Sequence, residues 1–391
     1  MALGAWGAAH ERRRMSDSTR PASVPTKELT PRREAPVTEV SKGAALIMAA
    51  LPVITALLIA AVVGDVLILA FGQSPAAVFS LLLEGTWGNA YGLGQVLYKA
   101  TTLVFTGLSV ALGIRAGLFN IGAEGQLAMG GFCAAVVGLA LPAGVPGIVA
   151  IPVCLGAAAL GGAAVAGVPG VLKARFGASE VIVTIMVNFI TLAFLNWLIA
   201  TKLSVAESLH TPEIQAGAVA RLSSVFDALR GSAANFVLLV ALAAAAFVGW
   251  YLFRTRAGYE LRAVGLQPEA AEYGGVKVGG VWLRAMLMAG ALAGLGGTNY
   301  VLGYKQYYEE GFAAGAGFLG IAVALVGRNH PVGVVIAALL FATLSQGGLA
   351  VNAIVPKQMV DVLTAVVIIT VATSVPEVQR LLKSVRRGGS T

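Results

Sequence analysis

Charged side chains are scarce in this sequence. Asp, Glu, Lys and Arg make up only 12% of its 391 residues, whereas 57% are hydrophobic and the mean hydropathy is +0.82. A soluble domain carries about 25% charged residues, because its surface must face water. This chain has too little polar surface for a water-soluble globule, so lipid is expected to cover much of it.

Cysteine and histidine are also rare, which excludes several kinds of site. Cys133 and Cys154 lie inside apolar runs, without the spacing of a disulfide or a metal-binding pair. His10, His210 and His330 are scattered, and no predicted membrane span contains a histidine. We therefore expect neither a metal centre nor a membrane enzyme, which would need a nucleophile and a base on neighbouring helices.

A nucleotide-binding P-loop is absent as well, since no GxxxxGK[ST] motif occurs. The net charge of +8 could indicate either nucleic acid or a membrane surface as partner. The basic residues, however, are spread over the N-terminal arm, short loops and the tail, and they form no single stripe. We therefore expect the lipid bilayer as a partner and no nucleic acid.

Apolar runs follow one another along most of the chain, and most reach the length of about 20 residues that crosses a bilayer. The run 316–327 is too short, which predicts a tilted half-helix or a re-entrant segment, and 75–84 is expected to be a short interfacial helix. Run 95–114 carries Lys99 and three threonines, so it is expected to face other helices. The predicted fold class is an all-α transmembrane bundle of about ten spans, near 44–64, 95–114, 121–141, 147–171, 180–200, 235–253, 281–303, 316–327, 331–350 and 359–374.

The positions of Lys and Arg predict that both termini lie in the cytoplasm. With ten crossings, 21 of the 27 basic residues fall inside, eight in the arm and thirteen in inner loops and the tail. Residues 1–42 are expected to form a disordered cytoplasmic arm, 43–375 the transmembrane domain and 376–391 a basic cytoplasmic tail. The long outer segment 201–234 is a candidate docking surface for an extracytoplasmic partner.

Three separated blocks carry a resemblance to a known family. They read RAGLFNIGAEGQLAMGG at 115–131, LRAVGLQPEAAEYGGVKV at 261–278 and GFLGIAVALVGRNHPVGVVIAALLFATL at 317–344. With the span pattern, they resemble ATP-binding-cassette (ABC) importer permeases of the sugar, nucleoside and branched-chain amino acid group. The resemblance covers roughly 44–374, and FNIGAEGQL with the later GRNHP looks most like the nucleoside type.

This resemblance implies a multi-pass permease of the bacterial inner membrane that forms the pathway for a small polar solute. It also implies three kinds of partner: cytoplasmic ATP-binding subunits, a second and different permease, and an extracytoplasmic solute-binding protein. ATP would be used by the partner subunits, and this chain would bind no cofactor and would not be an enzyme.

The longest inner loop, 254–280, has the pattern of two short helices. Pro268 suits the first position of a helix, and the pair Gly274 and Gly275 suits its end. From pattern alone, an ordinary solvated loop is the alternative. The resemblance implies a coupling helix over 261–273 that contacts the ATPase through Arg262, Ala263, Gly265, Glu269 and Ala270.

Polar residues interrupt the apolar sequence after Arg115. A carboxylate near hydrocarbon is expected to face a protein interior, a water-filled cavity or a basic partner. Asn120, Glu124 and Gln126 are therefore candidates for a gate or pathway element, and the glycines among them would permit an irregular helix beside a cavity. The alternative is a structural role, in which Glu124 pairs with Arg115 or caps a helix end.

Further amides within the spans are candidates for contact with the solute. Asn188 and Asn196 lie eight residues apart, about two helical turns, and so share one face of a span. Asn299 closes the seventh span and Gln346 the ninth. Amides suit the passage of a neutral polar solute, because they offer hydrogen bonds without fixing a charge. The alternative is that each amide only binds a neighbouring helix.

A secondary transporter is the alternative class of function. A secondary transporter would need coupling carboxylates within the membrane, yet Glu124, Glu180 and Asp361 all lie near predicted helix ends. Among importers, nucleosides are the expected solute, with simple sugars and branched-chain amino acids as alternatives. His330 is expected to be a turn residue before Pro331, and a pH-sensitive role is its alternative.

Overall fold

The computed structural model describes residues 55, 58–59, 61–205, 208–352, 354–356, 358, 361–362, 364–366 and 368–370. The predicted arm 1–42 and tail 376–391 lie outside the described residues, as do much of the predicted spans 44–64 and 359–374. Domain boundaries that depend on these segments stay predictions.

Helices make up most of the described chain, and no strand occurs within that part. The prediction of an all-α fold is confirmed. In chain order the elements are α2 (Pro75–Glu84), α3 (Ala90–Arg115), α4 (Ala123–Ala140), α5 (Gly147–Phe176), α6 (Glu180–Leu198), the π-helix η2 (Ile199–Leu203), the 3₁₀ turns η3 (Leu222–Ser224) and η4 (Asp227–Leu229), α7 (Val237–Arg254), α8 (Arg256–Leu266), α9 (Pro268–Tyr273), α10 (Val278–Tyr300), the π-helix η5 (Val301–Lys305), α11 (Ala316–Val326) and α12 (Pro331–Val351).

Seven helical spans in the described chain are long and apolar enough to cross a membrane. They are α3, α4, α5, α6 with η2, α7, α10 with η5, and α12, and each lies on a predicted run. An eighth span arises if the helical segment Ala61–Ala70 and α2, which are bent by 114°, count as one. Helix α11 is confirmed as too short to span. A total of ten crossings and the cytoplasmic position of both termini stay predictions.

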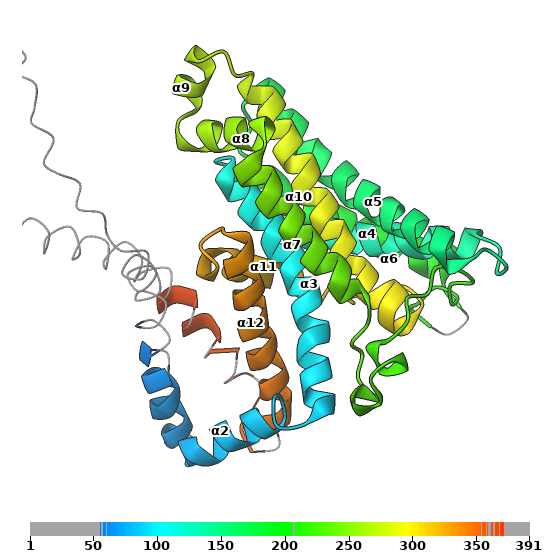
Figure 1. The fold of residues 1–391 in the computed structure, drawn as a ribbon, viewed down its shortest axis with the longest axis vertical. Helices are drawn as coiled ribbons and strands as arrows, with labels where there is room; N and C mark the ends of the chain where they lie inside the picture. The colour runs from blue at the N-terminus through cyan, green and yellow to red at the C-terminus, as the bar shows by residue number, and fades with distance from the viewer. Residues whose placement is uncertain are drawn as a thin grey trace, which may run out of the picture. The chain divides into compact units, whose positions relative to one another are not determined.

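Helix α3 lies at the centre of the bundle, with α7 and α10 on one side and α11 and α12 on the other (Figure 1). Its most apolar window is 72% buried, compared with 28% for α6 and for α7. The expectation that run 95–114 faces other helices is therefore confirmed. The loop before α7 and the pair α8 and α9 after it lie at opposite ends of that helix (Figure 1).

Helix α6 places polar side chains toward the protein interior and apolar side chains on its outer face. Thr184, Asn188 and Thr191 face inward and are buried, while Ile182 and Phe189 are exposed. A helix at a water surface has the opposite arrangement. The polarity of α6 therefore indicates that its outer face contacts lipid.

Helices α4, α5 and α10 approach one another through glycines. A Cβ atom added at Gly162 of α5 would lie 2.1 Å from the carbonyl oxygen of Gly290 in α10. One added at Gly130 of α4 would lie 2.2 Å from the Cα of Gly294. Backbones can come this close only where no side chain intervenes.

Candidate functional site

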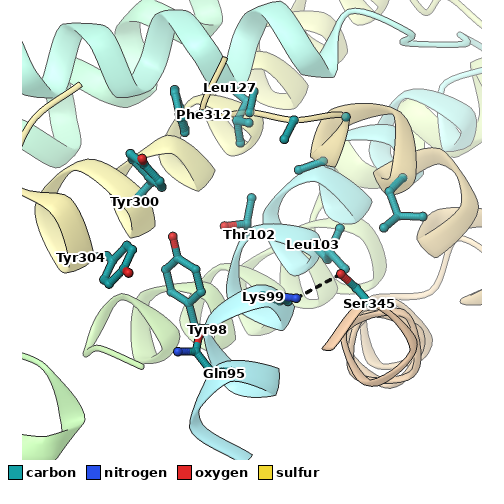
Figure 2. A pocket seen from close by; sticks show the side chains of 15 residues that line it. Gln95, Tyr98, Lys99, Thr102, Leu103, Leu127, Tyr300, Tyr304, Phe312 and Ser345 are labelled. Carbon is teal, nitrogen blue, oxygen red and sulfur yellow. Dashed lines mark hydrogen bonds between the residues drawn. The ribbon is translucent and has the colours of Figure 1, made fainter. Parts of the chain in front are cut away.

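A cavity of about 420 Å³ lies beside α3, and four aromatic side chains line one side of it (Figure 2). Tyr98 comes from α3, Tyr300 and Tyr304 from the end of α10 and from η5, and Phe312 from the segment before α11. A cavity of this size and composition fits a small organic molecule with a planar ring. The other lining residues are Gln95, Lys99, Thr102, Leu103, Leu127, Ala313, Ala314, Gly315, Ala316, Leu319 and Ser345.

The rings pack against one another along one side of this aromatic cavity. The ring centroid of Tyr304 lies 5.3 Å from that of Tyr98 and 6.1 Å from that of Tyr300. Phe312 lies 4.9 Å from Tyr300. On another side, the Lys99 ammonium donates a hydrogen bond of 3.3 Å to the Ser345 hydroxyl (Figure 2). The cavity therefore combines ring faces with a few hydrogen-bonding groups.

Asn299 lies directly behind the cavity wall and is fully buried. Its Nδ2 donates to the carbonyl oxygen of Tyr98 at 2.8 Å and to the hydroxyl of Thr102 at 2.9 Å. Its Oδ1 accepts from Nδ2 of Asn235 at 2.9 Å. Because Tyr98 and Thr102 both line the cavity, Asn299 fixes the position of the α3 wall.

Two predicted pathway residues form a buried amide pair, and a third, Asn188, binds the backbone nearby. Nδ2 of Asn120 donates to Oε1 of Gln126, and Nε2 of Gln126 donates back to Oδ1 of Asn120, both at 2.9 Å. Asn188 reaches this region from α6. Its Oδ1 accepts from the Gly125 N–H at 2.9 Å, and its Nδ2 donates to the Ile121 carbonyl at 2.8 Å. These bonds join α6 to the beginning of α4.

Glu124 holds the beginning of α11. Its two carboxylate oxygens accept from the backbone N–H groups of Gly315 at 2.8 Å and Gly317 at 2.6 Å. A carboxylate is favourable at a helix N-terminus, where N–H groups lack partners within the helix. The alternative that paired Glu124 with Arg115 is wrong, because the Arg115 Nε donates to the Asn329 carbonyl at 3.0 Å.

The last two predicted pathway residues lie elsewhere. Nδ2 of Asn196 donates to Oε1 of Glu310 at 2.6 Å, and Gln346 is buried in α12. The described lining of the aromatic cavity includes none of the seven predicted residues. Contact between them and a solute stays a prediction. Sequence reasoning missed the ring cluster, although Tyr300 and Tyr304 are four residues apart, the spacing of one helical face.

The loop 254–280 forms two short helices that pack on the end of the bundle. Thr255 begins α8 by accepting the Gly258 N–H at 3.0 Å. Glu260 ties α8 to α10 through an ion pair of 3.0 Å with Arg284. Gly265 touches the end of α3, since a Cβ there would lie 2.1 Å from the Arg115 carbonyl oxygen. Helix α8 therefore contacts the ends of both α3 and α10.

The outward face of α8 and α9 carries apolar side chains that sequence reasoning did not single out. Leu266 is 88% exposed and Tyr273 98% exposed, and both are at the end of the molecule that α9 occupies. Of the predicted contacts, Glu269 and Ala270 are exposed, whereas Ala263 and Gly265 are only partly so. Arg262 instead stacks its guanidinium over Phe253, at 5.4 Å from the ring centroid. A contact between these residues and an ATPase stays a prediction.

His330 lies in the turn before α12, next to other cations. The His330 ring stacks on the Phe253 ring, with the two centroids 5.3 Å apart. The guanidinium groups of Arg115 and Arg262 lie over the same Phe253 ring. Burial, and after it the charge of Arg115, lowers the pKa of His330 from its ordinary 6.5. The unfolded state then binds more protons below pH 6.5, so stability is lost as the pH falls from 6.5 through the lowered pKa.

We expect His330→Gln to make the protein less sensitive to acid. The melting temperature of the detergent-purified wild type should fall between about pH 7.5 and about pH 5.5, and that of the variant should fall less. Other groups contribute equally to both proteins. If the melting temperature fell equally in both proteins, the lowered pKa of His330 would be contradicted.

Comparisons with known proteins identify the family. Residues 92–372 match the family described as "Branched-chain amino acid transport system / permease component". The chain is 38% identical to the guanosine ABC transporter permease of Bacillus subtilis, over 82% of this chain and 92% of the relative. It is 35% identical to the nucleoside ABC transporter permease protein NupB of Lactococcus lactis, over 79% and 86% of the two chains. It is 32% identical to the glucose ABC transporter permease protein TsgB13 of Haloferax volcanii, over 83% and 87%.

These matches confirm the resemblance that the three sequence blocks indicate. The apolar helices agree with it, since they make this a multi-pass membrane protein. The chain belongs to the permease-component family of the branched-chain amino acid transport type, and it is the permease subunit of an ABC importer.

Proposed function

We propose that this permease imports nucleosides and that the aromatic cavity holds the nucleobase during passage. The observation that carries the proposal is the set of four rings that line the cavity. A nucleobase stacked on an aromatic side chain gains about 1–3 kcal/mol. Gln95, Lys99 and Thr102 supply hydrogen-bonding groups for the base edge and the ribose hydroxyls. Similarity to guanosine and nucleoside permeases supports the same solute.

Glucose is the second candidate, because a glucose permease is 32% identical to this chain. Glucose has no planar π-system, so four rings would contribute less to holding it. A branched-chain amino acid would bring an ammonium and a carboxylate group. Among the described lining residues, Lys99 alone is charged. The cavity therefore favours a neutral, planar solute over both alternatives.

The partners are proposed from the family and from the exposed end of the bundle. The family implies ATP-binding subunits and a binding protein in general. We infer that the ATP-binding subunits contact the outward face of α8 and α9, and that they bind and hydrolyse the ATP, so this chain needs no cofactor. We also infer a different permease as the second membrane subunit, and the inner membrane of a bacterium as the location.

Solute-stimulated ATPase activity of the complete complex in lipid tests the proposed solute. We expect stimulation by guanosine or uridine in the presence of the binding protein, and little by glucose or leucine. Phe312→Leu, which removes a ring face, should reduce nucleoside uptake about tenfold, equivalent to about 1.4 kcal/mol. Leu319→Met is the matched control, since it changes the lining but keeps its volume. If glucose stimulated the ATPase activity and nucleosides did not, the imported solute would be a sugar.

A further inference from the structure

Tyr304 lies between two pockets of different character. On one side is the aromatic cavity of about 420 Å³. On the other is a pocket of about 540 Å³ lined by Glu213, Ala218, Val219, Ala220, Arg221, Lys305 and Gln306, with Tyr304 itself in its wall. This second pocket, the polar pocket, carries charged groups of both signs. Tyr304 is the residue that the two linings share.

The Tyr304 ring closes one side of the aromatic cavity together with two further tyrosines. Its centroid lies 5.3 Å from that of Tyr98, and 6.1 Å from that of Tyr300 in an edge-to-face arrangement. The three side chains gather at the same side of the cavity in Figure 2. Contacts between aromatic rings contribute about 0.5–1.5 kcal/mol each beyond burial, which is weak enough to be broken and remade.

Two cations hold Tyr304 from the polar pocket. Nη2 of Arg221 donates to the Tyr304 carbonyl oxygen at 3.0 Å, and the same guanidinium lies 5.6 Å from the centre of the Tyr304 ring. The Lys305 ammonium lies 5.8 Å from that ring. Arg221 therefore fixes both the backbone and the side chain of Tyr304, and it does so from a separate loop.

That loop runs along the segment that carries Tyr304. The Val219 N–H donates to the Leu302 carbonyl at 2.8 Å, the Ile214 N–H to the Gln306 carbonyl at 2.7 Å, and the Thr211 N–H to the Tyr308 carbonyl at 2.8 Å. These bonds occur before and after Tyr304. We call residues 208–222 the clamp loop, because displacing it would release the segment on both sides of the ring.

The backbone around Tyr304 departs from regular α-helix. Val301–Lys305 is a π-helix, a form that is rare and frequent at functional sites. Gln306 ends it with φ +64°, in the left-handed region that non-glycine residues seldom adopt. Such a conformation costs of order 1–3 kcal/mol and persists only while the surroundings hold it. The clamp loop supplies that support through the bond from Ile214 to the Gln306 carbonyl.

We infer that Tyr304 is the gate between the polar pocket and the aromatic cavity, and that the clamp loop holds it closed through Arg221. When the loop moves, the cation leaves the ring and the carbonyl, and the side chain swings away from Tyr98 and Tyr300. The identity of the solute that passes this gate rests on the proposed function. The gate itself controls access to the aromatic cavity, whichever solute is carried.

Access of a charged thiol reagent to the aromatic cavity tests the gate without any solute. Cys133 and Cys154 are both free, so a cysteine-free parent carries Cys133→Ala and Cys154→Ala. Ala316→Cys then places a thiol in the lining of the cavity. A membrane-impermeant methanethiosulfonate is applied to the complete complex in lipid, without binding protein, and the labelling rate is measured. Tyr304→Ala should accelerate labelling at least about tenfold, which corresponds to about 1.4 kcal/mol.

Two further variants and a control separate the gate from general loosening. Arg221→Gln leaves every cavity residue in place and should also accelerate labelling, so the test survives if Tyr304→Ala fails to fold. Tyr304→Phe keeps the ring and should label like the parent. Phe226→Ala is the control, since Phe226 is 57% exposed, lies outside the clamp loop and is absent from both pocket linings.

Each result has one meaning. Unchanged labelling in both Tyr304→Ala and Arg221→Gln overturns the gate. Faster labelling in Tyr304→Ala alone keeps the gate and overturns the clamp. Equal acceleration by Phe226→Ala assigns the effect to general loosening of the protein and overturns both. Nucleoside uptake, measured separately on the parent, decides the proposed function, because reagent access requires no particular solute.

Discussion

Gly162→Ala should lower the stability of the permease sharply, while Gly156→Ala, six residues earlier in α5, should leave it nearly unchanged. The added methyl group at Gly162 would lie 2.1 Å from the Gly290 carbonyl oxygen and 2.8 Å from the Gly294 Cα. Both atoms belong to the backbone, so only separation of α5 from α10 relieves the clash. Overpacking of this kind costs about 1–3 kcal/mol, and loss of the helix contact adds to it. At Gly156 a methyl group meets no atom within 4 Å.

Thermal unfolding of both variants in the same detergent measures the difference, with gel filtration to report aggregation. The pair is well matched because the same chemical change is made in one helix, once toward α10 and once toward lipid. A melting temperature for Gly162→Ala within a degree or so of the Gly156→Ala value would mean that the α5–α10 contact is looser than these distances indicate.

Leu266→Asp combined with Tyr273→Ala should abolish retention of the ATP-binding subunits and, with it, ATP-driven uptake. The two side chains are 88% and 98% exposed on α8 and α9, although leucine and tyrosine usually bury part of their surface. Tyrosine is enriched among interface residues whose truncation costs 2 kcal/mol or more, and an aspartate at position 266 would place a charge in an apolar contact. Two such losses together would weaken binding by about a thousandfold, or about 4 kcal/mol.

Co-purification of the ATP-binding subunits with the tagged permease measures this effect directly. Phe226→Ala is the matched control, because it removes an aromatic ring that is 57% exposed in the loop before α7, at the opposite end of that helix. The control should retain the subunits at the wild-type level. If the double variant retained the ATP-binding subunits fully, Leu266 and Tyr273 would not be part of the interface.

Helices and their ends were largely predictable from the sequence, because local composition determines them. Each of the long helices in the described chain lies on an apolar run, and the shortness of 316–327 predicted that α11 would not span. Pro268 and the glycines after Tyr273 predicted α9, which extends from Pro268 to Tyr273. These signals act within one or two helical turns, so a single sequence contains them.

The partners of the polar residues could not be predicted, because they lie far away along the chain. Glu124 binds Gly315 and Gly317, which are about 190 residues later, and Asn188 binds the turn at Ile121. Arg115 was an attractive partner for Glu124 by proximity in sequence alone. The aromatic cavity was missed for the same reason, since its rings come from α3, α10, η5 and the segment before α11.

Two helix starts in this bundle are completed by side chains from other helices. The N-cap positions of α4 and α11 make no side-chain cap of their own. Asn188 of α6 accepts the Gly125 N–H in the first turn of α4, and Glu124 of α4 accepts two N–H groups at the start of α11. In lipid, an N–H group without an acceptor costs several kcal/mol.

The two caps depend in opposite ways on the order of synthesis. A ribosome releases α4 first, then α6, and only much later α11, so α4 depends on a later helix for its cap, whereas α11 depends on an earlier one. Translation that stopped after α5 would leave the Gly125 N–H in the first turn of α4 without the Asn188 acceptor. The half-length helix α11, by contrast, emerges when Glu124 is already in place to receive it.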